Sequence, residues 1–209
     1  MKTDSEMKVY ILIGGIGSGK STVSRMLQNE GATCIDLDDV GHDVLMKPEV
    51  IDMLVETFGE GILDASGEIA RAELAKQAFA TPASTVKLNA ISQPRLAAEA
   101  HAQLEKLEED GCPLAIVEIS AYDGPTGTFA PFVRRAAGII AVTAPTRLRI
   151  ERAQAKGFDP RDVKNRIARQ VSDEQRALWA DYVVGNKGTL EDLQTRVDEV
   201  WAQIAPAKE

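Results

Sequence analysis

One eight-residue stretch near the N-terminus constrains this chain more than any other feature. Residues 14–21 read G-G-I-G-S-G-K-S and satisfy the pattern G-x-x-x-x-G-K-S. The preceding run, Val9 to Ile13, is continuously apolar and predicts a strand that is covered on both faces. A helix is predicted from Ser21 to Glu30, with Gly31 placed to end it. A strand, a glycine-rich turn and a helix in this order predict a loop whose backbone amides surround a polyphosphate.

Two side chains of this loop have expected roles of their own. Lys20 would place a mobile positive charge at the β and γ phosphates, and Ser21 would ligate magnesium. The alternative is an ordinary glycine-rich turn with an exposed lysine. Agreement between the motif and both flanking elements favours nucleotide binding.

The rest of the chain alternates predicted strands and helices. Further strands are expected at 34–36, 114–119, 139–143 and 182–184. This alternation predicts an α/β fold with a parallel five-stranded sheet and helices on both sides. The interval from Asp38 to Pro113 is far longer than the dozen or so residues that a crossover needs, so we expect a helical insertion at about 40–112 within a single domain 1–209. A long helix in this insertion is expected to be interrupted near Pro94.

Carboxylates follow the second predicted strand in the stretch Asp36-Leu37-Asp38-Asp39. Ligands of open α/β sheets collect at the carboxyl ends of the strands, where this stretch and the glycine-rich loop are both expected. A carboxylate there can accept the proton of an acceptor hydroxyl, and Asp36 could ligate metal through water. On spacing alone, capping of the next helix by Asp38 or Asp39 is an equally good interpretation.

A basic segment at about 147–172 is the third feature. From residue 147 to 169 the chain holds eight bases and three acids, a net charge of +5, although the whole chain carries −8. Such a segment suits a mobile lid that closes over phosphates. Asp159 and Pro160 fit a helix cap and a first helical position, which divides the segment into two helices around Gly157. The alternative is a solvated helix face.

Composition excludes several classes of protein. The net charge of −8 argues against a nucleic-acid binder or a polybasic membrane protein, and no apolar run approaches the ~20 residues that span a bilayer. Cys34 and Cys112 are widely spaced, so a reducing, cytoplasmic location is expected. Either Met1 or Met7 could be the true start, because residues 1–6 are polar. A monomer or small homo-oligomer is expected.

Several spaced motifs resemble the dephospho-coenzyme A kinase family. The loop with Thr22 resembles its phosphate loop, and Ile35-Asp36-Leu37-Asp38 resembles its strand-end D-x-D motif. Further similar stretches are Phe58-Gly59, Ile62-Leu63-Asp64 with Gly67, Ile150-Glu151-Arg152, Arg166-Ile167-x-x-Gln170, and Asp181 with Asn186-x-Gly188. The resemblance covers nearly the whole chain and implies a three-layer P-loop kinase fold with an acceptor-binding lobe and a lid.

The resemblance also implies an activity, namely magnesium-dependent transfer of the γ-phosphoryl of ATP to the 3′-hydroxyl of dephospho-coenzyme A. It implies Asp38 as catalytic base, with Lys20 and Arg152 offsetting charge on the transferring group. The implied nucleotide-binding residues are Gly15, Gly17, Ser18, Gly19, Lys20, Ser21, Thr22, Asn186 and Gly188, and the implied metal-binding residues are Ser21 and Glu118.

Two departures from the family pattern lie toward the acceptor side. Gln93 stands where the family has histidine before proline, and Ser120 to Gly124 replaces an apolar run that ends in glutamate. The departures leave open a kinase for another small acceptor, such as a nucleoside monophosphate, or a catalytically silent ATP-binding regulatory protein. A GTPase switch is less favoured, because the stretch from Asn186 to Thr189 lacks the aspartate that grips guanine.

Overall fold

The computed structural model describes residues 7–206. Residues 1–6, with the question of a start at Met1 or Met7, lie outside this part. The chain forms two compact units. The sheet unit contains the residues up to Asp36 together with those from Leu107 onward, and the helical unit is Leu37–Lys106. The expected insertion at about 40–112 overlaps the helical unit.

The sheet unit is built on five parallel strands, as the sequence predicts. They are β1 (Lys8–Gly14), β2 (Thr33–Asp36), β3 (Leu114–Ile119), β4 (Gly138–Thr143) and β5 (Tyr182–Gly185), in the order β2-β3-β1-β4-β5. Every residue of β3 is buried, because helices cover both faces of a parallel sheet. In the register, Glu118 of β3 lies opposite both Leu12 of β1 and Asp36 of β2.

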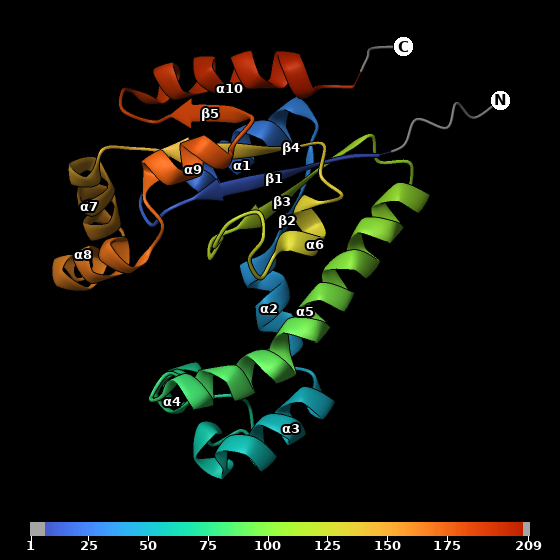
Figure 1. Cartoon of the computed structure of the whole chain (residues 1–209), viewed down its shortest axis with the longest axis vertical. Coiled ribbons are helices and arrows are strands. Elements are labelled where there is room, and N and C mark those ends of the chain that lie inside the picture. The colour runs from blue at the N-terminus through green and yellow to red at the C-terminus, as the bar shows by residue number, and fades with distance from the viewer. Residues whose placement is uncertain (1–6, 207–209) are drawn as a thin grey trace. The chain divides into compact units, whose positions relative to one another are not determined.

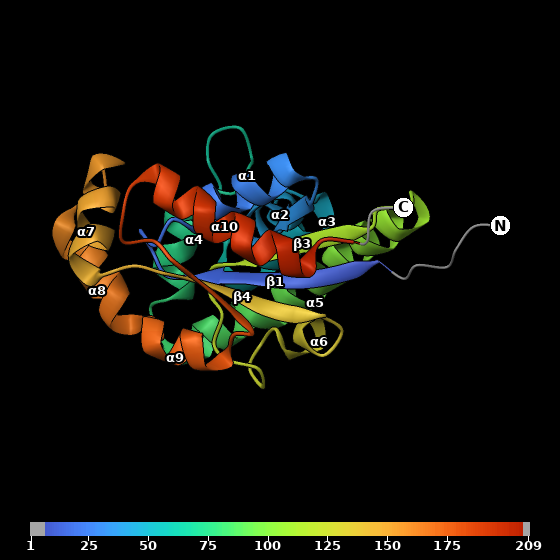
Figure 2. The same ribbon diagram turned by 90° about the horizontal axis from the view of Figure 1, so that it is seen from above.

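Helices lie on both faces of this sheet and complete a three-layer arrangement. Figure 2 shows α1 (Lys20–Glu30) and α10 (Leu190–Ile204) on one side and α6 (Ala130–Val133) and α9 (Asp173–Trp179) on the other. Apolar side chains of α1 and α10 form one core with β1, β3, β4 and β5. The C-cap of α1 is Gly31 with φ 115°, as predicted for the residue that ends this helix.

Two further helices form the basic segment. They are α7 (Thr146–Ala155) and α8 (Pro160–Arg169), and Figure 1 shows both beyond the carboxyl ends of the strands. The predicted boundary between them is confirmed, because the Asp159 carboxylate accepts hydrogen bonds from the backbone amides of Arg161 and Asp162. Pro160 occupies the first helical position, where its missing N–H costs no hydrogen bond.

The helical unit has its own small core. Its elements are α2 (Leu37–Leu45), α3 (Pro48–Phe58), the 3₁₀ turn η1 (Glu60–Ile62), α4 (Arg71–Ala78) and α5 (Pro82–Glu109), which continues into the sheet unit. Fully buried Val50, Leu54 and Ile62 lie at the centre of this core. Val50 and Leu54 lie one turn apart on α3, and this face packs against η1 and α4.

The expected interruption of the long helix near Pro94 is wrong. α5 is continuous across Pro94, although proline removes one helical donor and its ring crowds the preceding turn. Two side chains next to the proline hydrogen bond to carbonyls of that turn. Arg95 donates to the carbonyl of Ile91 at 2.7 Å, and Ser92 donates to that of Leu88 at 2.9 Å. The helix therefore accommodates the local cost of the proline.

Within residues 7–206, no helix combines the length and the apolar character that crossing a membrane would require.

Candidate functional site

The glycine-rich loop connects β1 to α1 and is closed on itself. The amide of Ser18 donates to the carbonyl of Gly15 at 3.0 Å, and Gly19 caps α1 with a left-handed φ of 100°. Only glycine adopts this conformation without strain, and a Cβ on Gly19 would also collide with the side-chain amide of Asn186. The first amides of α1 have no partner inside the helix, so they form an anion-binding end.

Lys20, the lysine of the loop, is buried against a carboxylate. Its Nζ lies 2.5 Å from Oε2 of Glu118, and the two side chains are 8% and 6% exposed. Glu118 is the second-last residue of β3, so its carboxylate lies at the carboxyl edge of the sheet. A buried ammonium needs such a partner, because removing a charge from water is costly. Lys20 and Glu118, two residues that the resemblance implicates, are therefore in direct contact.

A second contact joins the loop to the basic segment and to the turn after β5. Arg152 of α7 donates to the backbone carbonyl of Asn186 at 3.1 Å and to its Oδ1 at 3.0 Å. The Nδ2 of Asn186 then donates to the carbonyl of Ser18 at 2.8 Å. Arg152, Asn186 and Ser18 are all expected site residues. The fold brings them together although Ser18 and Asn186 are 168 positions apart.

An apolar cavity of about 390 Å³ adjoins this network. Gly17, Gly19 and Thr22 line it on the side of the loop, and Arg152, Asn186 and Gly188 also contribute. Much of the remaining wall is apolar and comes from Ala153, Phe158, Leu190 and Leu193. A largely apolar cavity with a few polar groups at one edge suits a flat aromatic base.

A buried group of charges lies on another side of the loop, and the sequence did not single it out. Arg149 of α7 donates through Nε to the carbonyl of Ile16 at 2.9 Å and contacts Asp173 at 3.2 Å. Asp173 also pairs with Arg176 at 2.9 Å. Burial lowers the pKa of Arg176, and Asp173 opposes this shift. A Cβ on Gly15 would collide with the guanidinium of Arg149, so this close packing requires glycine there.

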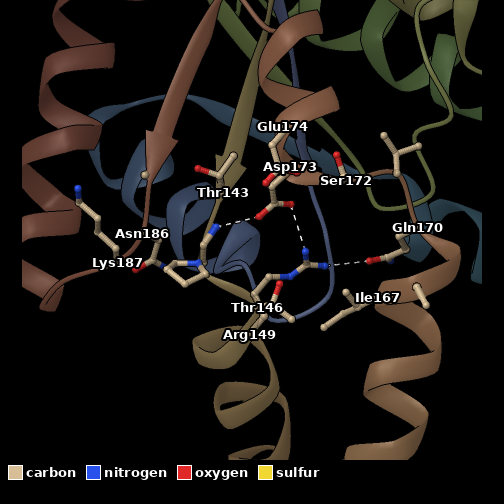
Figure 3. A pocket seen from close by; sticks show the side chains of 15 residues that line it. Thr143, Thr146, Arg149, Ile167, Gln170, Ser172, Asp173, Glu174, Asn186 and Lys187 are labelled. Atoms are coloured by element: carbon tan, nitrogen blue, oxygen red, sulfur yellow. Dashed lines mark hydrogen bonds and ion pairs between the residues drawn. The ribbon is translucent and has the colours of Figure 1, made fainter.

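Figure 3 shows the side chains around these charges, where Arg149 and Asp173 line a cavity of about 460 Å³. Gln170, which the resemblance included, accepts from Arg149 in this view and also accepts from the amide of Ile16. Arg149 was counted among the bases of the basic segment, but no sequence pattern separates it from its exposed neighbours. Only its burial identifies it.

The bases of the basic segment differ in their exposure and in their contacts, and its role as a lid stays a prediction. Arg149 is buried and Arg152 is half-buried, and both are bonded to the loop or to the turn beside it. The other six bases, Arg147, Lys156, Arg161, Lys164, Arg166 and Arg169, are exposed, as on a solvated face. The bases that bond to the phosphate loop or to this turn thus lie on α7, and Gln170, the C-cap of α8, adds a further contact to the loop.

Oxygen ligands for a divalent cation are grouped at the edge of the sheet. Asp36 and Glu118 are register partners on adjacent strands. Ser21 is exposed and is the second residue of α1, next to Lys20. Among residues 7–206, no group of three or more histidine, cysteine or acidic side chains could hold a metal. Magnesium on a nucleotide needs no such group, because it keeps several waters and phosphate oxygens as ligands. The donor set therefore fits this cation.

Asp38 lies in the helical unit, in the first turn of α2, and its side chain is exposed. The helix begins at Leu37, so Asp38 and Asp39 are inside the first turn and neither is its cap. Asp38 lines a cavity of about 230 Å³ together with His42, Arg71 and Ser92. The other lining residues, Leu37, Gly41, Val44, Leu45, Leu88 and Leu96, are mostly apolar.

The two departures from the family pattern occupy different units. Gln93 is half-buried on α5 in the helical unit, and Ser120 to Gly124 follows β3 in the sheet unit. Within the latter segment Tyr122 is buried and packs edge-on against Trp179, with ring centroids 5.6 Å apart. Burial raises the pKa of the Tyr122 hydroxyl, and the nearby Asp123 adds to this shift.

Comparisons with known proteins agree with the geometry. The family model described as dephospho-CoA kinase matches residues 9–192. A Corynebacterium diphtheriae protein named dephospho-CoA kinase is 36% identical over 95% of this chain and 98% of its own length.

Two solved structures share the fold. A Thermus thermophilus protein has a TM-score of 0.80 at 29% identity, covering 96% of this chain and all of the other. A dephospho-CoA kinase from Campylobacter jejuni has a TM-score of 0.70 at 20% identity, covering 96% of this chain and 98% of its own, which supports the fold alone. With a family model that spans most of its length, the chain belongs to the dephospho-CoA kinase family.

Proposed function

We propose that this protein transfers the γ-phosphoryl of ATP to the 3′-hydroxyl of dephospho-CoA, giving CoA and ADP, in the cytoplasm. One observation carries the proposal beyond family membership. The loop lysine, Lys20, is buried at the carboxyl edge of a parallel sheet, and a base-sized apolar cavity lies on the same loop. To bind a nucleotide, a site needs a positive charge for the phosphates and a cavity for the aromatic base, and this loop offers both.

The nucleotide would bind entirely to the sheet unit. Its base would occupy the apolar cavity, with Arg152 and Asn186 at the polar edge. The phosphates would lie over the loop amides from Gly15 to Lys20 and the start of α1, which supply donors and the positive end of a helix. The Lys20 ammonium, which pairs with Glu118 in this structure, would also donate to phosphate oxygens when the nucleotide binds.

Magnesium would be held by Ser21 directly, and by Glu118 and Asp36 through water. When bound with ATP, the cation would neutralise charge on the β and γ oxygens. Glu118 would then have two functions, because the same carboxylate that orients Lys20 would also hold the water shell of the cation.

The acceptor would bind to the helical unit. Its cavity combines apolar walls with Arg71, His42 and Ser92, and Asp38 is part of the same lining. Apolar walls suit a pantetheine-like arm, whereas Arg71 offers a fork of donors for an anionic group. The exposed Asp38 carboxylate would accept the proton of the 3′-hydroxyl as the new P–O bond forms.

Charge on the transferring group would be offset by Lys20 and Arg152. Arg152 already has two hydrogen bonds that fix its guanidinium beside the loop. Donors that are held in place before the reaction stabilise developing charge without reorganisation. Phosphoryl transfer depends mostly on such positioning.

The test is a product analysis. Purified protein would be incubated with Mg-ATP and dephospho-CoA, and the products examined by mass spectrometry. We expect a product heavier by one phosphate together with one ADP per product. A parallel reaction with AMP tests the nucleoside monophosphate alternative. ATP binding without any phosphorylated acceptor would instead identify a silent binding protein.

A further inference from the structure

Three charged side chains form a buried group beside the phosphate loop. Arg149 and Arg176 both donate to Oδ1 of Asp173, at 3.2 and 2.9 Å. The exposed fraction of the side chain is 4% for Arg149, 2% for Arg176 and 14% for Asp173. With two positive charges and one negative charge, the group carries a net charge of +1. A buried excess charge is costly unless it faces an opposite charge. The exposed carboxylate of Glu174 interacts electrostatically with Arg149, and an anion at the loop would balance the positive charge further.

Arg149 and the neighbouring Gln170 hold the loop backbone on both sides of the Ile16 Cα. The carbonyl of Ile16 accepts from Nε of Arg149 at 2.9 Å, and the amide of Ile16 donates to Oε1 of Gln170 at 3.0 Å. Arg149 donates to the same Oε1 at 3.2 Å. The peptides before and after Ile16 therefore both have a fixed partner, and Arg149 of α7 bonds one of them directly and also bonds Gln170, the partner of the other.

Asp173 ties the whole group to the sheet. Its second oxygen, Oδ2, accepts from the backbone amide of Ala144 at 3.0 Å, directly after the end of β4. Figure 3 shows Asp173 between the end of this strand and Arg149. We call this chain of contacts the frame: it runs from the end of β4 through Asp173 and Arg149 to Ile16. Side chains that are locked by such supporting bonds hold a site in its working geometry.

We propose that Arg149 and Asp173 are positioning residues for phosphoryl transfer, which hold the loop backbone at Ile16 and place a positive charge near the transferring phosphoryl group. The inference rests on the proposed function and deepens it. The hydrogen bonds of this frame reach the lining of the base cavity at Ile16, whereas the rest of that lining and the amides at the start of α1 are held by other contacts. Loss of the frame should therefore lower kcat more than it weakens ATP binding.

The first test compares two arginines on the same helix. Arg149→Gln removes the buried guanidinium, and Arg147→Gln removes an exposed one that pairs with Glu151 on the same helix. We expect Arg149→Gln to lower kcat by about 10–100-fold while the KM for ATP changes by less than about 3-fold. Arg147→Gln should match the wild type. An Arg149→Gln enzyme with the kcat of Arg147→Gln would overturn the proposal.

A second test separates positioning from folding. Arg149→Gln leaves Asp173 paired with Arg176, so the variant keeps a neutral buried pair, whereas Asp173→Asn leaves two buried arginines without a carboxylate. We expect Arg149→Gln to keep a melting temperature near that of the wild type and Asp173→Asn to lose stability. If Arg149→Gln loses stability, ATP affinity and kcat together, the arginine is only structural and the proposal fails.

Chemical rescue adds a direct readout. Arg149→Ala should regain several-fold of its lost kcat in millimolar guanidinium, while Arg147→Ala should not respond; absence of rescue counts against the proposal. Slow hydrolysis of Mg-ATP to ADP would be measured in parallel. If dephospho-CoA is not phosphorylated by the wild type, the function proposed above fails, but the hydrolysis rates of the same variants still test the role of Arg149. A wild type that forms no ADP at all overturns both.

Discussion

In the part of the chain that the structure describes, each unit contains a short lysine–glutamate pair, and the two pairs differ in their surroundings. In the sheet unit, Lys20 and Glu118 are 8% and 6% exposed. In the helical unit, Lys47 and Glu99 are 41% and 30% exposed at a distance of 2.6 Å. The nitrogen–oxygen distances of the two pairs are nearly equal, so the pairs differ in their exposure to solvent and not in the contact itself.

Solvent decides what each pair can contribute. A pair at the surface is screened and adds little to stability, whereas a buried pair has lost its hydration and leaves a costly charge if one partner is removed. A buried pair is therefore a poor choice for stability alone. A functional reason accounts for the buried pair better, because Glu118 holds the Lys20 ammonium in an orientation in which it can bind an anion at the phosphate loop.

The largest expected effect comes from breaking the buried pair. Lys20→Met leaves Glu118 without its cation, so we expect a loss of about 3–5 kcal/mol in the free energy of unfolding. The rate of phosphoryl transfer should fall by about 10³-fold, because the main charge on the loop is lost. Denaturant unfolding and coupled ADP assays measure both. Lys47→Met is the matched control, and equal losses in the two variants would erase the contrast between the units.

The next effect tests the helical unit. Asp38→Asn should lower kcat by about 10²-fold, because the amide cannot accept the hydroxyl proton. ATP affinity should be unchanged, since the nucleotide would bind to the other unit. Asp39→Asn alters an exposed neighbour in the same turn and serves as control. Near-normal turnover of Asp38→Asn with intact ATP binding would reject Asp38 as the base.

A smaller effect is expected from the cavity of the helical unit. Arg71→Gln removes the cationic fork from its lining, so the KM for dephospho-CoA should rise by about 10-fold while the KM for ATP stays constant. Initial rates with each substrate varied in turn provide the measurement. Lys76→Gln removes an exposed charge from α4 and should change neither constant. A rise in the KM for ATP alone would place the acceptor elsewhere.

The smallest effect concerns pH and the surface pair. The hydrogen bond from Lys47 lowers the pKa of Glu99 below its ordinary value of 4.5, so this contribution to stability is present above that value and is lost as the pH falls through the lowered pKa. The same bond raises the pKa of Lys47, so its contribution is lost only at strongly alkaline pH.

Melting temperatures of the wild type and Glu99→Gln, recorded from about pH 7 down to about pH 3, check this prediction. The small difference between them should vanish toward low pH. A difference that grows on acidification would contradict the assigned direction of the shift.

Short-range patterns predicted most of the fold. The strands at 114–119 and 139–143 agree with β3 and β4 to within one residue, because continuous β-branched runs suit a sheet buried on both faces. The Asp159–Pro160 boundary depends only on local capping and is also confirmed. Pro94 is the exception, since α5 continues across it in spite of the local cost of a proline inside a helix.

The candidate site likewise contains residues that the sequence identified and residues that only the fold identified. The loop motif identified Lys20, and the resemblance named Arg152, Asn186 and Glu118, which the fold brings to the loop. The separation of Arg149 from its exposed neighbours could not be predicted, because all the bases of α7 read alike in sequence. The roles of Asp38, Ser21 and the other site residues stay predictions until the variants are measured.

By itself the sequence determined the order of strands and helices, the anion-binding loop and the family, because hydrophobic periodicity, glycine spacing and capping act over a few residues. Only the tertiary structure decided which charges lose their water. Burial of Lys20, Glu118, Arg149 and Arg176 arises where strand ends, loop and α7 converge, and the cost of removing a charge from solvent depends on every group packed around it.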